Sequence, residues 1–177
     1  MICRIALHGY AGAGKDEVGT RLINRIDNMV RVAFGDIIKK QVDSICLKHL
    51  KFSAFTSDRE QKKVIREFLV HWGYANYQAI LDEFLLKLPV RCVNTRIFRL
   101  EEAHEWSAKG GFIVLVKRPR HNAAEPMEKL ELQRCVDAGL INYTLNNNGS
   151  LVNLDTKVGK MIDALGYRSL DRGAQQK

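Results

Sequence analysis

The sequence predicts an α/β fold, a three-layer α/β/α sandwich built on a five-stranded parallel sheet. Five short apolar runs alternate with amphipathic helical patterns, a glycine-rich loop joins the first run to the first helix, and no long linker divides the chain. Alternation of strands and helices is typical of parallel sheets that are covered on both faces. We therefore expect a single domain over residues 1–177.

The first strand, the loop and the first helix have the clearest signals. Residues 2–7 form an apolar run rich in β-formers, and the segment from Gly9 to Gly14 then supplies three glycines in six residues. From Lys15 onward, apolar positions recur at helical spacing as far as residues 27–28. The predicted order is strand, glycine loop, helix.

The chain continues with one further strand and three helices before residue 89. Residues 29–34 are predicted as a strand, and Asp36 after them stands in the position of an N-cap for the next helix. Polar residues interrupt the pattern at 53–58, and Pro89 ends the last helical stretch. The three expected helices cover residues 36–50, 64–72 and 77–88.

The C-terminal half repeats the alternation. Gly110 and Gly111 lead into the longest apolar run, which we predict as the fourth strand. Residues 117–133 are strongly charged and hold two of the three prolines, so we expect a mobile surface segment there. The expected strands lie at 90–93, 112–116 and 141–145, the expected helices at 100–108 and 151–165, and a polar tail at 167–177.

Composition and charge narrow the class of protein. The chain has 28 Lys and Arg against 20 Asp and Glu, a net charge of +8 with neutral histidines, and 46% hydrophobic residues. These values exclude a disordered tail, a collagen-like repeat and a small disulfide scaffold. The positive charge favours an anionic partner, which could be nucleic acid, an anionic membrane or a phosphorylated small molecule.

Nothing in the sequence has the pattern of a membrane anchor or an export signal. The apolar run 112–116 is far shorter than the roughly 20 residues of a spanning helix, and the N-terminus lacks a signal peptide's basic region and cleavage site. Four scattered cysteines show neither zinc nor disulfide spacing. We expect a cytoplasmic protein without membrane contact, in the host cytoplasm if it is viral.

The strongest motif is a phosphate-binding loop. Residues 9–16 read GYAGAGKD and fit the pattern G-x-x-x-x-G-K. Backbone N–H groups around such a bend and the positive end of the next helix bind phosphate, and the lysine reaches the β- and γ-phosphates. The alternative is an ordinary glycine-rich turn with a surface lysine. The expected phosphate-binding residues are Gly9, Gly12, Ala13, Gly14, Lys15, Asp16 and Glu17.

Asp16 stands where such loops usually carry Ser or Thr, whose hydroxyl group binds Mg²⁺. A carboxylate is also a hard oxygen ligand. Asp16 is therefore the candidate magnesium ligand, either directly or through a water molecule.

Polar residues directly after the predicted strands are the other candidates, because ligands gather at the carboxyl ends of strands in an open parallel sheet. Asp36 follows the second strand, Arg96 the third and Arg118 the fourth. Each has a simpler interpretation, which is a helix cap for Asp36 and exposed surface charge for the two arginines.

Five blocks of the sequence together resemble the phage-type deoxynucleoside monophosphate kinase family. In that family G-K-D replaces G-K-[ST], an A-x-x-D-x-x-K segment follows the second strand, and a D-x-R-x-x-x-E segment follows the third. The resemblance implies a P-loop kinase fold with a lid, ATP as phosphoryl donor, Mg²⁺, and a nucleoside monophosphate as acceptor. The matching blocks are residues 9–16, 33–39, 94–103, 116–119 and 142–151.

The resemblance also implies roles for single residues. Lys15 and Arg118 would act on the transferred phosphate, and Asp36 would orient the acceptor's sugar or a magnesium-bound water. A lid over residues 118–133 would present Arg118 with Lys117, Arg120 and His121, while Glu125 and Glu128 are expected as solvated surface. The residues expected to bind the acceptor, largely within 36–88, are Asp36, Lys39, Arg66, Trp72 and Arg96.

Two positions depart from the family pattern. Asn94 stands where the family has an acid that helps to hold Mg²⁺, and Glu17 where it commonly has Thr. Asp16 or Asp36 is the candidate to compensate. The departures leave open a divergent substrate or a weakened enzyme.

The main prediction is ATP-dependent phosphorylation of a nucleoside monophosphate, with a second copy of the chain as a further candidate partner. A P-loop kinase of another small metabolite, of the dephospho-coenzyme A or shikimate type, is an alternative because the loop does not identify the acceptor. A nucleotide-binding module that engages nucleic acid is the third. The positive charges are scattered and no nucleic-acid motif occurs, so we expect no specific nucleic-acid partner.

Overall fold

The computed structural model describes residues 2–119, 122–123 and 126–167. The chain divides into two compact units, a larger one of Met1–Val32 and Pro89–Lys177 and a smaller one of Ala33–Leu88. The predicted lid residues Arg120, His121 and Glu125, and the polar tail from residue 168 onward, lie outside the described residues.

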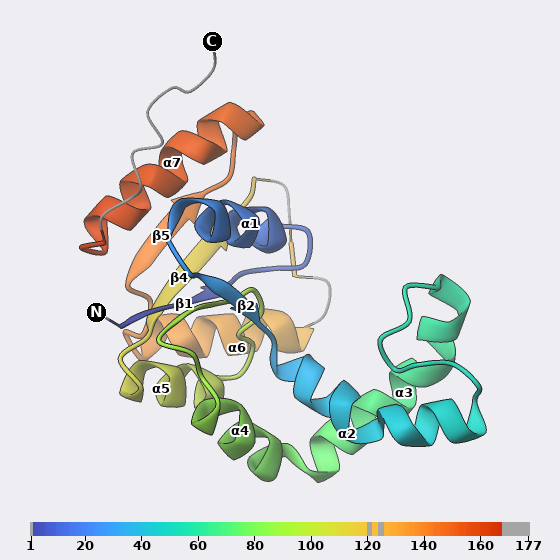
Figure 1. The fold of residues 1–177 in the computed structure, drawn as a ribbon. Coiled ribbons are helices and arrows are strands. Elements are labelled where there is room, and N and C mark those ends of the chain that lie inside the picture. Colours follow the sequence, from blue (N-terminus) through green and yellow to red (C-terminus); the bar gives the residue numbers. More distant parts are fainter. Residues whose placement is uncertain (1, 120–121, 124–125, 168–177) are drawn as a thin grey trace. The chain divides into compact units, whose positions relative to one another are not determined.

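The larger unit is built on a five-stranded sheet in which every pairing is parallel (Figure 1). The strands are β1 (Cys3–His8), β2 (Val30–Val32), β3 (Arg91–Asn94), β4 (Phe112–Lys117) and β5 (Tyr143–Asn146), in the order β2-β3-β1-β4-β5. The predicted α/β architecture on a five-stranded parallel sheet is confirmed.

β1 occupies the centre of this sheet, between β3 and β4. Ile5 pairs with Val93 of β3 on one side and with Phe112 of β4 on the other. Ile5 and Leu7 are fully buried, as expected for a central strand with both faces covered. The carboxyl end of β1, where His8 leads into the glycine loop, therefore lies at the middle of one edge of the sheet.

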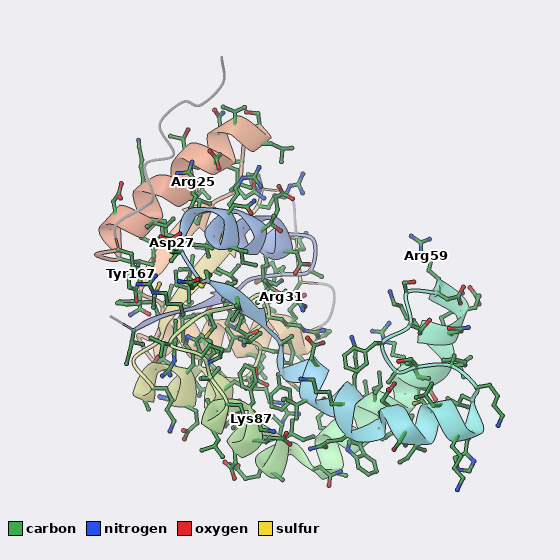
Figure 2. The ribbon with its side chains drawn as sticks, viewed as in Figure 1. Arg25, Asp27, Arg31, Arg59, Lys87 and Tyr167 are labelled. Atoms are coloured by element: carbon green, nitrogen blue, oxygen red, sulfur yellow. The ribbon has the colours of Figure 1, made fainter. Side chains whose placement is uncertain are left out.

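Among the described residues of the larger unit, four helices cover the sheet. α1 (Lys15–Arg25) and α7 (Leu151–Ala164) lie on one face, and α5 (Leu100–Ala108) and α6 (Pro126–Asp137) on the other (Figure 1). Val18 of α1 and Val158 of α7 belong to one buried apolar cluster with β1. Arg25 of α1 donates to both carboxylate oxygens of Asp155 in α7, at 3.2 and 2.5 Å, where the two helices lie side by side (Figure 2).

The smaller unit consists of three helices, α2 (Phe34–His49), α3 (Arg59–Ala75) and α4 (Tyr77–Leu86). Asp58 caps α3 by accepting the Gln61 N–H at 2.9 Å. α2 contributes Val42 and α3 contributes Ile65 to a small buried cluster. Arg59 and Lys87 mark two exposed positions of this unit (Figure 2).

No described helix combines the length and the hydropathy that crossing a membrane requires.

The start of α2 differs from the prediction. The N-cap is Ala33, not Asp36, which lies in the first turn of the helix and donates its N–H to the Ala33 carbonyl at 3.0 Å. The Phe34 ring packs 5.7 Å from the Tyr77 ring and 6.0 Å from the Phe84 ring. This packing starts the helix before the polar residue, whose carboxylate still lies near the positive end of the helix.

The prediction of a mobile segment throughout 117–133 was also wrong, because α6 begins at Pro126, a residue favoured at the first helical position. Leu132 and Cys135 of α6 are buried. The charged residue Glu131 obscured this apolar face in the sequence, yet Glu131 is only 5% exposed. It accepts the Leu100 N–H at 2.9 Å and a bond from Arg134 at 2.6 Å, so its burial is satisfied.

Candidate phosphate-binding site

The loop between β1 and α1 has the backbone conformation of an anion-binding loop. Gly9, Gly12 and Gly14 have φ angles of 137°, 75° and 93°, which L side chains rarely adopt. A Cβ atom on Gly9 would collide with the carbonyl oxygen of Val116, and one on Gly14 with the side-chain amide of Asn147. Glycine is thus required at both ends of the loop for conformation and for space.

Lys15 is the first residue of α1 and lies against the loop. Its Nζ donates to the carbonyl oxygens of Gly9 at 2.5 Å and Tyr10 at 2.9 Å. Partial burial lowers the pKa of Lys15 and Arg96 lowers it further, while the carboxylates of Glu128 and Asp16 act in the opposite direction. The ammonium group thus lies in a partly desolvated site close enough to Arg96 to be influenced by its charge.

Side chains from two distant segments hold the loop. Asn147, directly after β5, donates through Nδ2 to the Ala13 carbonyl at 2.9 Å, and its backbone N–H bonds the Lys117 carbonyl at 2.7 Å. Arg118 donates to the Gly12 carbonyl at 3.4 Å. Asn147 lies in a block of the resemblance but received no role from the sequence. Its position after the fifth strand was the signal that could have identified it.

Glu128 of α6 also contacts the loop, since its Oε1 accepts the Ala11 N–H at 2.8 Å. Its prediction as solvated surface was wrong. The two residues lie 117 positions apart in the sequence, so no local pattern could have indicated the contact.

His8 fixes the start of the loop from inside the sheet. It is 1% exposed, and its Nδ1 accepts the Gly9 N–H at 2.8 Å. Burial, with a second contribution from the charge of Lys15, lowers the pKa of His8 from 6.5 to about 4. His8 is therefore neutral at neutral pH, and Nδ1 is free of a proton to accept this bond.

A cavity of about 480 Å³ adjoins the loop within the larger unit. Its size falls within the range of small-molecule sites. Its walls include Tyr10 and Ala13 of the loop, Val116 and Arg118 at the end of β4, and Leu132 and Val136 of α6.

The acidic residues near the loop could provide one ligand for a magnesium ion but not its complete coordination shell. Asp16 is exposed in the first turn of α1, whereas Glu17 is ion-paired with Arg21. The described part of the chain holds no cluster of three or more metal-ligating side chains. One carboxylate completed by water and phosphate oxygens is a common arrangement for Mg²⁺, so Asp16 fits that role.

Asn94, which replaces an acid of the family pattern, shapes the turn after β3. It is buried, and its Oδ1 accepts the Arg96 N–H at 3.1 Å. The Arg96 guanidinium is exposed and lies 5.9 Å from the centre of the Phe98 ring.

The other residues predicted for the acceptor lie in the smaller unit. Asp36 and Lys39 of α2 pair at 3.7 Å, and Lys39 also lies 5.5 Å from the centre of the Phe55 ring. Trp72 is half-buried and donates to Gln41, and Arg66 is exposed on α3. The structure thus places Lys15 and Arg118 against the loop in one unit, and Asp36 and Lys39 together in the other. Arg96 lies near enough to Lys15 to lower its pKa.

Comparison with known proteins supports the fold. No protein-family model matches the sequence. No curated protein sequence matches it either. The fold is similar to that of shikimate kinase from Acinetobacter baumannii in complex with shikimate, at 14% identity and a TM-score of 0.50, over 95% of this chain and 96% of that one.

Two further structures are similar over most of their length. Shikimate kinase from Bacteroides thetaiotaomicron has 13% identity and a TM-score of 0.49, over 94% of this chain and 99% of that one. Dephospho-CoA kinase from Campylobacter jejuni has 12% identity and a TM-score of 0.45, over 90% and 95%. The similarity to the Acinetobacter baumannii structure, at 14% identity, shows the fold alone. The resemblance to deoxynucleoside monophosphate kinases stays a prediction.

Proposed function

We propose that the protein is a P-loop kinase that transfers the γ-phosphoryl group of ATP to the phosphate of a nucleoside monophosphate, with Mg²⁺. The observation that supports this most directly is the loop itself. Its three glycines have positive φ angles, it ends in Lys15 at the start of a helix, and it adjoins a cavity of about 480 Å³, within the range of small-molecule sites.

The loop and Lys15 would bind the donor. Lys15 would exchange the carbonyls of Gly9 and Tyr10 for β- and γ-phosphate oxygens, while loop N–H groups bind the phosphates from the other side. Arg118 starts from a contact with Gly12 and would bring a second positive charge to the transferred group. Mg²⁺, with Asp16 near it, neutralises charge on the phosphates when bound. Positioning and charge neutralisation provide nearly all the catalysis in such reactions.

Arg96 is the acceptor ligand that the larger unit itself offers. It follows β3, is exposed, and influences the charge of Lys15. A guanidinium at that place can bind the acceptor's phosphate through paired hydrogen bonds. The acceptor roles of Lys39, Arg66 and Trp72 rest on the resemblance, and that of Asp36 rests on the resemblance and on its place after the second strand.

A kinase of another small metabolite is the second candidate. The fold shared with shikimate kinase fits it equally well, because fold and phosphate loop do not identify the acceptor. Only the acceptor that is turned over can separate the two candidates.

A coupled assay of ADP release tests both candidates. It compares ribo- and deoxynucleoside monophosphates with shikimate and dephospho-coenzyme A, using wild type, Lys15→Ala and Lys160→Ala, an exposed control on α7. We expect turnover of at least one nucleoside monophosphate, a loss of a hundredfold or more for Lys15→Ala, about 3–4 kcal/mol, and no change for Lys160→Ala. Turnover of shikimate or dephospho-coenzyme A alone supports the second candidate, and turnover of none contradicts kinase activity.

A further inference from the structure

α6 carries a carboxylate to the phosphate-binding loop. Glu128 lies in the first turn of this helix, is partly buried, and accepts the Ala11 N–H at 2.8 Å. Ala11 belongs to the bend between Gly9 and Gly14, whose N–H groups are the natural donors to a phosphate. A negatively charged oxygen therefore already occupies one of the donors that a nucleotide phosphate would use.

The same carboxylate acts on the loop's lysine. Among the charged side chains that influence the pKa of Lys15, Glu128 has the largest effect, and it raises that pKa. Its effect exceeds that of Asp16, although Asp16 is the neighbour of Lys15 in the sequence. Because Lys15 also donates to the Gly9 and Tyr10 carbonyls, the groups that should bind phosphate have partners within the chain itself.

We propose that Glu128 is an internal anion that competes with nucleotide phosphates for the phosphate-binding loop, so that nucleotide binding requires release of the contact between Glu128 and Ala11. The inference rests on the proposed function to the extent that the loop binds nucleotide. A carboxylate and a phosphate accept the same N–H groups and repel each other near one ammonium group, so the two cannot occupy the loop together.

The anchoring of α6 indicates which part of the helix would move. One turn beyond Glu128, Glu131 is buried and bonds the Leu100 N–H and Arg134. Glu128, by contrast, bonds the loop amide of Ala11 at the exposed surface of the unit. Release of the first turn can therefore occur while Glu131 keeps the rest of the helix in place.

α6 also lines the cavity beside the loop, through Lys129, Leu132, Gln133 and Val136. A ligand that fills the cavity and places phosphates on the loop contacts this helix at both places. We therefore expect ADP, which has a base, a ribose and phosphates, to displace Glu128 from the loop. We expect the same of inorganic tripolyphosphate, which reaches only the loop.

Calorimetric titration with ADP and with tripolyphosphate tests the inference. The proteins are wild type, Glu128→Gln, which removes the charge, Glu128→Ala, which also removes the contact, and Glu105→Gln, an exposed control on α5 with the same change of net charge. If the contact occupies the loop about nine-tenths of the time, its removal tightens binding roughly tenfold. We expect that gain for both Glu128 variants with both ligands, and less than a twofold change for Glu105→Gln.

Other results overturn the inference in distinguishable ways. Equal affinity in wild type and both Glu128 variants, with binding lost in Lys15→Ala, leaves the proposed function standing and removes the competition. Weaker binding by the Glu128 variants would show that Glu128 favours nucleotide binding, which contradicts the inference. Absence of binding in all proteins, with the Glu128 variants folded, contradicts both proposals.

A second measurement needs no nucleotide. The Ala11 amide proton resonance in a ¹H–¹⁵N spectrum should shift on Glu128→Ala and stay in place on Glu105→Gln. An unchanged Ala11 resonance in Glu128→Ala would show that the contact is not formed in solution and would overturn the inference.

Discussion

The two units of this protein use their polar residues in different ways. In the larger unit, the glycine loop between β1 and α1 is held by groups that bond its backbone, His8 at Gly9, Arg118 at Gly12 and Asn147 at Ala13. In the smaller unit, polar side chains bond one another: Trp72 donates to Gln41 at 3.0 Å, and Gln41 donates to Glu83 at 3.0 Å. A site made from backbone needs glycines at fixed spacing, whereas a network of side chains leaves no such pattern in the sequence.

The largest expected effect on stability comes from replacing a glycine of the loop. Gly9→Ala forces a side chain into a positive φ angle and against the Val116 carbonyl, so we expect a loss of at least about 3 kcal/mol of unfolding free energy. Gly35→Ala, in the first turn of α2 with open space around its Cβ position, should be neutral or stabilising by up to about 1 kcal/mol. Urea denaturation measures both. Equal stability of the two variants would contradict the strain assigned to Gly9.

The second effect is a pH dependence of stability that His8 should cause. Its folded pKa of about 4 lies below the unfolded value of 6.5, so the unfolded state binds more protons between these pH values. Stability should therefore be complete above pH 6.5 and fall with pH, by about 2 kcal/mol between pH 7 and pH 5. His8→Asn, which keeps an acceptor near Gly9, should lack this contribution, while His71→Asn on the exposed face of α3 should retain it. Identical pH profiles for the two variants would refute the assignment.

A smaller effect examines the network of the smaller unit. Gln41→Ala leaves the half-buried Trp72 N–H and the Glu83 carboxylate without this partner, which should cost about 1–2 kcal/mol in urea denaturation. Gln78→Ala removes only an exposed bond to Asp82 and should change stability by less than about 0.5 kcal/mol. A Gln41 variant as stable as the Gln78 variant would mean that the network contributes nothing.

The smallest effect concerns the ion pair between α1 and α7. Arg25 hydrogen-bonds Asp155 and lowers its pKa, but the Asp155 side chain is 48% exposed. Asp155→Asn should therefore cost about 0.5 kcal/mol at low salt and almost nothing in 1 M salt. Thermal unfolding at both salt concentrations measures this, with Asp163→Asn as the exposed control on the same helix. A loss that persists in 1 M salt would indicate packing rather than charge.

The sequence predicted the fold and the loop because both depend on short-range patterns. Apolar runs marked the five strands, and the spacing of Gly9, Gly14 and Lys15 marked the loop. It did not predict the contact of Glu128 with Ala11, since the partners are distant in the chain and a glutamate on a charged helix has the pattern of solvated surface.

Local rules also gave wrong answers where tertiary packing decided the outcome. Asp36 was expected to cap α2, but the ring of Phe34 packs against Tyr77 and Phe84 and sets an earlier start. The sequence did not predict α6, because a buried glutamate interrupts its apolar face. Glu131 can be buried there since it bonds the Leu100 N–H and Arg134, and a hydrophobic pattern does not report such bonds. Residue types alone do not reveal which charged side chains are buried.

The bond between Asn147 and Ala13 spans 134 positions of the sequence. During synthesis the loop near the N-terminus therefore leaves the ribosome long before the residues that hold it, Arg118 and Asn147. At typical elongation rates the delay is roughly ten seconds. A nascent chain that ends before residue 147 should accordingly lack the proposed nucleotide binding, which should appear only as the last strand and helix are completed.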